Sequence, residues 1–380
     1  MRILIPVDHA LGISGPHRNV VGSLNALGAR DDVTVSLLTG IVDKNEPYSQ
    51  APNIDITLGY KPHEPKRVLH NLRLLQKAQA SCDLIYVPSG LKSLLLAQVA
   101  RRPGRPLVAG PNVTPLPSRR HDSPGWLDLR LLTNAWFEAS RARQNHVMRV
   151  TGNPNIGVVP HAIDHVKFSP ERRNPEIWDD YGIPRHSTKL LYVGKDYERK
   201  GVPQLLDAFS ILSATHPALV LVVVGNMSPE TIDRIRAMPN VFALGFVQGE
   251  RLAQIYASSD ISVVPSSWES FGFTALEAMS SGLAVVAGNG GALPETIING
   301  ESGILVDIAN EQVKHRDNSG EILAAALVQL VQDLEHRKRL GANARRRVLD
   351  HFTEVRLGDD LVHLFAKTRG GIHPSVKSPQ

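Results

Sequence analysis

The chain has 380 residues, a length that suggests two domains. Its hydrophobic content of 42% is ordinary for a globular protein, and no apolar run approaches the ~18–20 residues that a membrane-spanning helix needs. Cys82 is the only cysteine, which excludes an intrachain disulfide and fits a reducing compartment. The first residues are strand-like and lack a signal-peptide pattern, so we expect a cytoplasmic protein.

Charge is unevenly distributed along the chain, whose net charge is +5. Residues 1–165 carry 19 basic and 12 acidic side chains, a net +7, whereas the remainder carries 23 and 25, a net −2. A basic N-terminal half indicates an acidic partner, such as an anionic acceptor, a membrane surface or nucleic acid, or else ordinary solvated arginines. Because no nucleic-acid-binding motif is present, we expect no nucleic-acid partner.

Short aliphatic runs alternate with helical patterns from one end of the chain to the other. The predicted strands are residues 3–7, 33–38, 84–87, 107–109, 156–159, 190–193, 219–224, 241–244, 261–264, 284–286 and 304–306. Helical patterns include residues 17–27, 66–80, 91–100, 202–214, 250–258, 274–281 and 352–367. Several strands are continuously apolar, as expected when helices cover both faces of a parallel sheet. This order predicts doubly wound, Rossmann-like α/β domains.

A domain boundary is indicated where turn-forming residues follow the apolar run that ends at Val159. We expect an N-terminal domain over residues 1–165 and a C-terminal domain over 166–350. A final helix would occupy residues 351–369, and residues 370–380 would form a frayed tail.

The segment at 265–277 (PSSWESFGFTALE) is the most informative, because it joins an apolar strand to a helix. Ligands of open α/β sheets bind at the carboxyl ends of strands, and a helix N-terminus favours phosphate. Gly272 would allow close backbone approach. Glu269 and Glu277 would accept hydrogen bonds from sugar hydroxyls. Alternatively, Glu269 is a solvated loop residue and Glu277 complements the helix dipole from the first turn.

Two further strand ends carry groups that suit a diphosphate. Lys195, Arg199 and Lys200 lie in a glycine-bordered loop between a strand and a helix, where cations could bind phosphate. A solvated charged turn is the alternative. Gly225 follows the next strand, where it allows either a plain turn or a close ligand contact.

The N-terminal half offers weaker candidates. Gly15 precedes a helix and could present backbone amides to a phosphate. Asn112 follows a strand, and His9 and His121 lie in predicted loops. Alternatively, His9 and His121 are ordinary surface or core residues without a functional role. No zinc-type cluster and no paired aspartates after a strand suggest a metal site.

Together these segments resemble the retaining glycosyltransferases of family 4, also called glycosyl transferases group 1, over nearly the whole chain. The family's Glu-x(7)-Glu signature matches Glu269 and Glu277, and its surrounding Pro-Ser-x-x-Glu-x-Phe-Gly and Leu-Glu-Ala-Met-x-x-Gly pattern matches residues 265–282. Further family-like positions are Gly290-Gly291, Pro294-Glu295 and the interdomain stretch 159–164. The resemblance implies the GT-B fold, two Rossmann-like domains facing across a cleft, with the acceptor on the N-terminal side and the nucleotide-sugar on the other.

The resemblance also implies roles for individual residues. Glu277 would hold the donor ribose, Glu269 the donor sugar, and Lys195 and Lys200 the diphosphate. Further donor contacts would come from backbone at Gly15, Gly225, Val247, Phe271, Gly272, Phe273 and Thr274. The acceptor-side candidates are His9, Asn112 and His121. No metal or other cofactor is required in this scheme, because lysines and helix-end amides stabilise the leaving diphosphate.

The sequence departs from the family pattern at two important positions. The basic pair is usually Arg then Lys, but Lys195 stands at the Arg position and loses its bidentate geometry. Asn112 lies in a loop where many members have a histidine, and an amide is no acid or base. We expect a retaining transferase acting on an unidentified glycan, lipid-linked or small acceptor, anionic or membrane-associated. A nucleotide-sugar 2-epimerase-like isomerase and a catalytically degenerate nucleotide-sugar-binding scaffold are the alternatives.

Overall fold

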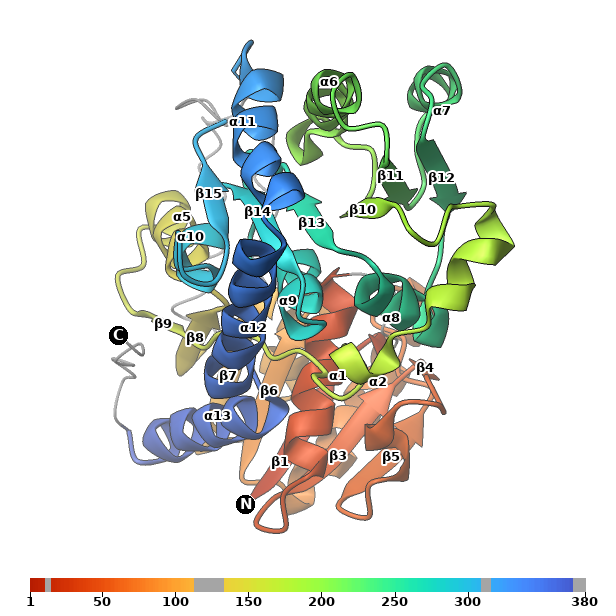
Figure 1. Cartoon of the computed structure of the whole chain (residues 1–380). Helices are drawn as coiled ribbons and strands as arrows, with labels where there is room; N and C mark the ends of the chain where they lie inside the picture. The colour runs from red at the N-terminus through yellow and green to blue at the C-terminus, as the bar shows by residue number, and fades with distance from the viewer. Residues whose placement is uncertain (11–14, 113–132, 309–315, 372–380) are drawn as a thin grey trace. The chain divides into compact units, whose positions relative to one another are not determined.

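The computed structural model describes residues 1–10, 15–112, 133–308 and 316–371 (Figure 1). These residues form two compact units. The first holds Met1–Ala162 together with the chain from Glu354 onward, and the second holds Ile163–Thr353. Both boundaries expected from the sequence, after residues 165 and 350, therefore lie three residues inside the second unit. Within the described residues, no helix is both long and apolar enough to cross a membrane.

The first unit is built on a sheet in which neighbouring strands run parallel. Across the sheet the order is β5 (Ile54–Leu58), β3 (Thr34–Thr39), β1 (Arg2–Pro6), β6 (Leu84–Ser89), β7 (Leu107–Asn112), β8 (Ala135–Glu138) and β9 (Ile156–Val158). Two short strands, β2 (His9–Ala10) and β4 (Ile41–Val42), pair separately. The helices are α1 (Gly15–Gly28), α2 (Val68–Ala78), α3 (Leu91–Ala100), α5 (Arg141–Thr151) and α13 (Glu354–Arg369).

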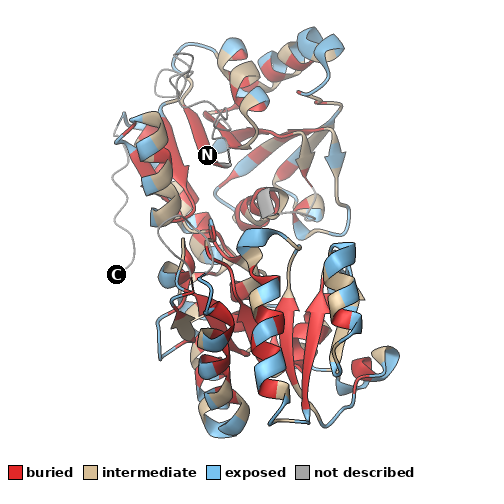
Figure 2. Cartoon of the chain, turned by 90° about the horizontal axis from the view of Figure 1, so that it is seen from above, coloured by how far each residue is buried: buried red, intermediate tan, exposed pale blue. Residues whose placement is uncertain are grey.

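Both faces of this sheet are buried, which explains why its strands are continuously apolar. In β1, Ile3 and Ile5 belong to a core shared with α1 and α13, whereas Leu4 belongs to a core shared with α2, α3 and α5. Successive strand residues point to opposite faces, so both faces need apolar side chains. Figure 2 shows most of the strands as buried, whereas the exposed residues lie largely on the helices and loops.

The second unit repeats this arrangement with another parallel sheet. Its strand order is β12 (Val241–Gly245), β11 (Leu219–Val224), β10 (Thr188–Val193), β13 (Ile261–Val264), β14 (Ala284–Gly288) and β15 (Ile304–Val306). The helices are α6 (Val202–Ser213), α7 (Pro229–Arg236), α8 (Gly249–Ser258), α9 (Phe273–Ser280), α10 (Leu293–Thr296), α11 (Ser319–Gln332) and α12 (Leu334–His351). One core joins the sheet to α6, α7, α11 and α12.

The predicted doubly wound α/β architecture is therefore present in both units. Strands β5 and β8 were not predicted, because their segments carry polar residues within short runs. The final helix begins at Glu354 rather than at residue 352, because Phe352 is the C-cap of the preceding helix α12, which ends at His351.

Chain order reverses at one strand in each sheet. From β1 the chain builds outward through β3 and β5, then crosses to β6 on the other side. From β10 it builds outward through β11 and β12, then crosses to β13. Ligands of open α/β sheets bind outside the carboxyl ends of the strands at such a switch point. The loops after β1, β10 and β13 are therefore where functional side chains are expected.

Candidate functional site

The loop after β13 carries the first segment singled out from the sequence. It covers residues 265–272 and leads directly into α9. Gly272 has φ +93°, a left-handed value that glycine adopts without strain. A Cβ there would lie 3.1 Å from Leu293 Cδ2. This glycine therefore turns the chain from the loop into the helix.

A second loop, after β14, packs its backbone against the first. A Cβ on Gly290 would lie 1.9 Å from the carbonyl oxygen of Ser267, and one on Gly291 would lie 2.1 Å from that of Glu269. The Ala292 N–H donates to the same Glu269 oxygen at 2.8 Å. The backbone at Glu269 is thus fixed by contacts that only glycine permits.

Glu269 and Lys200, which come from loops after β13 and β10, form an ion pair. Lys200 Nζ donates to Glu269 Oε1, and Ser266 Oγ donates to the same oxygen at 2.7 Å. Arg199 Nη1 lies 3.9 Å from Glu269 Oε2. The side chains of Lys200 and Glu269 are 17% and 9% exposed, so water screens their attraction only weakly. The alternative that Glu269 is a solvated loop residue is wrong.

Arg199 connects the same two loops through both its backbone and its side chain. Its carbonyl oxygen accepts from the Ser267 N–H at 2.9 Å, and its Nη1 donates to the Trp268 carbonyl at 3.0 Å. Arg199 was predicted as one of the cations of this loop but was given no individual role. Ser266 was not among the predicted site residues, and it gave no signal because its neighbour in the chain is also serine.

Lys195 and Gly225 occupy the loops after β10 and β11. The Lys195 side chain is exposed, and its carbonyl oxygen accepts from Tyr192 Oη at 3.1 Å. Gly225 has φ +130°, and a Cβ there would lie 1.8 Å from the carbonyl oxygen of Gly194. Close packing of the two loops therefore accounts for glycine at position 225, and its donor contact stays a prediction.

Glu277 lies on α9 and is almost completely buried, with 1% of the residue exposed. Its Oε2 accepts from Tyr256 Oη of α8 at 2.9 Å. Because α9 begins at Phe273, Glu277 is in the second turn, and the alternative of a first-turn residue complementing the dipole is wrong. The tyrosine fixes one carboxylate oxygen in place.

The remaining donor-side candidates present backbone rather than functional side chains. The Phe271 ring is buried and packs edge-on against Phe273, with centroids 5.2 Å apart. Thr274 is half-buried in the first turn of α9, where N–H groups have no intrahelical acceptor. Val247 is half-buried in the connection between β12 and α8.

The first unit holds the other candidates. Gly15 is the first residue of α1, and Asn112 is the last residue of β7. His9 was expected in a loop but lies in the short strand β2, because the chain pairs there with β4. His121 lies outside the described residues. In the described ranges, no group of three or more His, Cys, Asp or Glu side chains is placed to hold a metal ion.

Comparison with known proteins finds a family match for part of this chain. Residues 174–347 match the family model described as Glycosyl transferases group 1. A D-inositol 3-phosphate glycosyltransferase of Corynebacterium kroppenstedtii is 32% identical over 58% of this chain and 50% of its own length. A glycogen synthase of Mycobacterium tuberculosis is 31% identical over 60% of this chain and 52% of its own. The chain spans about half the length of these curated relatives.

Solved structures extend the likeness of fold to nearly the whole chain. A glycosyltransferase of Rickettsia africae has a TM-score of 0.73 at 18% identity, covering 97% of this chain and 98% of that one. The Anabaena protein Alr3699/HepE, in complex with UDP and glucose, has a TM-score of 0.72 at 19% identity, covering 97% and 100%. At these identities the likeness shows the fold alone, which is GT-B as predicted. Over residues 174–347 the chain is therefore similar to the group 1 glycosyltransferases, and its fold is the one that these solved structures share.

Proposed function

We propose that this chain is a retaining glycosyltransferase that moves a sugar from a nucleotide-diphosphate sugar onto an acceptor hydroxyl. The observation that carries the proposal is the Lys200–Glu269 ion pair at the switch point of the second sheet. It places a cation suited to a diphosphate beside a carboxylate suited to sugar hydroxyls. Both residues lie within the region that matches the family model.

In this proposal the second unit binds the donor. The acceptor hydroxyl oxygen bonds to the anomeric carbon, the bond from that carbon to the diphosphate oxygen breaks, and the hydroxyl proton passes to the leaving phosphate. Lys200, Lys195 and the first-turn amides of α9 would stabilise the charge that develops on the diphosphate. Arg199 is a further candidate, because its guanidinium lies within 3.9 Å of the Glu269 carboxylate. Glu269 would hold the sugar hydroxyls.

Glu277 would orient the donor ribose in the same proposal. Its burial and its bond from Tyr256 leave the carboxylate little freedom to rotate, so the group would meet a ribose hydroxyl in a fixed direction. Backbone at Gly225, Val247, Phe271, Gly272 and Phe273 would complete the donor site, with Thr274 and, from the first unit, Gly15.

The acceptor side of the proposal rests on the first unit, with His9 and Asn112 as candidates and His121 among the residues that are not described. Its excess of basic residues supports an anionic or membrane-associated acceptor. A cytoplasmic location belongs to the same proposal, since Cys82 is a buried free thiol.

Incubation with UDP-, GDP- and ADP-linked glucose, with and without candidate acceptors, tests the proposal. UDP-glucose comes first, because Anabaena HepE is described in complex with it. A transferase releases nucleoside diphosphate and a new glycoside with the anomeric configuration retained. An epimerase converts the donor without acceptor, and a scaffold binds donor without change.

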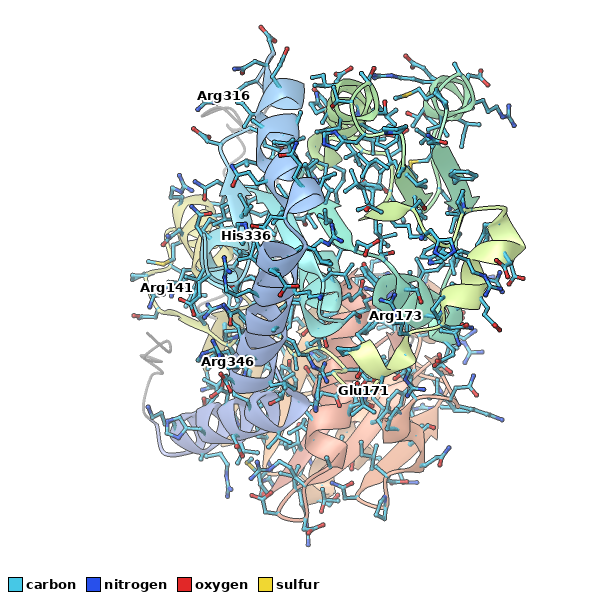
Figure 3. All side chains as sticks on the ribbon, viewed as in Figure 1. Arg141, Glu171, Arg173, Arg316, His336 and Arg346 are labelled. Atoms are coloured by element: carbon cyan, nitrogen blue, oxygen red, sulfur yellow. The ribbon has the colours of Figure 1, made fainter. Side chains whose placement is uncertain are left out.

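Two lysine variants make the test specific to the site. Lys200→Met should lower donor turnover about 100-fold, the loss expected for one preorganised electrostatic group. Lys338→Met is the matched control, since Lys338 forms an exposed pair with Glu335 on α12, the helix on which Figure 3 labels His336 and Arg346. Equal turnover by both variants would refute the assignment of Lys200.

A further inference from the structure

The two carboxylate oxygens of Glu269 have different surroundings. Oε1 accepts from Lys200 Nζ and from Ser266 Oγ. Oε2 accepts no hydrogen bond from any residue that the structure describes, and Arg199 Nη1 lies 3.9 Å from it. An oxygen in this state is either buried without a partner or accessible to solvent. The buried atoms without a partner in the described ranges do not include Glu269 Oε2, so this oxygen is accessible.

Arg199 is anchored so that its guanidinium stays beside this accessible oxygen. Its carbonyl oxygen accepts from the Ser267 N–H at 2.9 Å, and its Nη1 donates to the Trp268 carbonyl at 3.0 Å. Both partners immediately precede Glu269 in the chain. Within the described residues, the Trp268 bond is the one hydrogen bond that the Arg199 side chain makes, and 44% of that side chain is exposed. Because a guanidinium has five N–H donors, several are left for a ligand.

One ligand atom can contact Arg199 and Glu269 at the same time. The two atoms are 3.9 Å apart, so a single oxygen can lie ~2.8 Å from each, an ordinary hydrogen-bond distance. A carboxylate can only accept and a guanidinium can only donate, so the shared atom must do both. A hydroxyl does so, whereas Arg199 would repel an ammonium group and Glu269 would repel an anion.

We propose that Arg199 is a specificity-determining residue, which binds one hydroxyl of the donor sugar jointly with Glu269 Oε2. The ligand class is a sugar with a neutral hydroxyl at that ring position, and a sugar with hydrogen or an ammonium group there is rejected. The inference rests on the proposed function, which puts the donor sugar on Glu269. It gives Arg199 a role at the sugar, beyond its candidacy for the diphosphate.

A merely structural Arg199 would behave differently. If the guanidinium only tied the two loops together through Trp268, its loss would weaken all nucleotide-sugars by the same factor. An arginine that binds one hydroxyl makes a difference only to sugars that carry this hydroxyl. The ratio of affinities for two donors that differ by one hydroxyl therefore separates the two roles, because any change in loop shape or diphosphate binding cancels.

Calorimetric binding measures this ratio without turnover. The probes are UDP-, GDP- and ADP-glucose, the three nucleoside diphosphates without sugar, and the 2-, 3-, 4- and 6-deoxy analogues of the nucleotide-glucose that binds best. The wild type should bind one analogue about 100-fold more weakly than its parent, the loss of two charge-assisted hydrogen bonds. For Arg199→Met the same comparison should give only about a tenfold loss, because Glu269 alone then holds the hydroxyl.

Arg234→Met is the matched control. Arg234, in the last turn of α7, is 40% exposed and likewise contacts a carboxylate, that of Asp207, and a backbone carbonyl, that of Pro203. This variant should keep the full loss of the wild type. Arg199→Lys, which keeps the charge without the fork of donors, replaces Arg199→Met if the latter does not fold, and its loss should lie between the two.

Equal losses for the wild type and the Arg199 variant overturn the inference. A wild type that binds every deoxy analogue as tightly as the parent also overturns it, as does one that binds no nucleotide-glucose more tightly than the nucleoside diphosphate. The predicted losses without transfer of sugar to any acceptor would instead count against the transferase function and leave the role of Arg199 in sugar binding supported.

Discussion

Replacing Lys200 by methionine should destabilise the second unit, because it leaves the Glu269 carboxylate buried without its main partner. Removing one member of a buried ion pair costs about 3–5 kcal/mol. Here the loss should be smaller, about 2–3 kcal/mol, since the two side chains are 17% and 9% exposed and Arg199 Nη1 lies 3.9 Å from the carboxylate. For a unit of roughly 190 residues this corresponds to a fall in Tm of about 5–10 °C.

Thermal unfolding followed by calorimetry measures this effect, with Lys338→Met as the control. Adding Glu269→Gln to Lys200→Met should restore part of the lost Tm, because a neutral amide is less costly to bury than an unpaired charge and can still bond Ser266. A Tm within 1 °C of wild type for Lys200→Met, which corresponds to less than about 0.5 kcal/mol, would refute the reasoning. So would a double variant less stable than both single variants.

Three further predictions concern stability. Tyr256→Phe removes the donor to Glu277 Oε2 and should cost about 1–3 kcal/mol in urea unfolding. An unchanged midpoint would contradict a stabilising role for this hydrogen bond. Gly225→Ala should cost about 2 kcal/mol or more, because φ is +130° and the new Cβ would lie 1.8 Å from the Gly194 carbonyl oxygen. Gly22→Ala, in a helix with open space around the new methyl group, should instead stabilise the protein by about 0.5–1 kcal/mol. Burial, and then a neighbouring arginine, lowers the pKa of His161 to about 3. Between about pH 3 and 6.5 the unfolded chain is therefore protonated at this histidine and the folded chain is not, so stability falls as the pH is lowered. The loss should be about 2–3 kcal/mol from pH 7 to pH 4.5. His161→Asn should abolish this part of the pH dependence.

The sequence was sufficient to predict the architecture. Strands such as Leu219–Val224 are apolar at every position, which is the pattern expected when helices cover both faces of a parallel sheet. It also singled out the loops after β10 and β13, from Gly272, Lys200 and the spacing of the two glutamates. Short strands with polar residues, such as β8 (Ala135–Glu138), were missed because burial in the sheet overrides local composition there.

The side-chain partnerships could not be predicted. The bond from Ser266 to Glu269 and the position of Arg199 depend on how two loops, far apart in sequence, pack together. Likewise, His63 is 55 residues from Asp8, and only the folded sheet brings them within 3.4 Å. Spacing rules describe contacts along one helix or strand, and they do not apply across loops.

A crystal structure with the cleaved nucleotide-sugar bound tests the central claim most directly. We predict diphosphate oxygens within hydrogen-bonding distance of Lys200 Nζ, sugar hydroxyls on Glu269 and a ribose hydroxyl on Glu277. A donor bound elsewhere, with the Lys200–Glu269 pair intact and in contact with no part of it, would contradict the account.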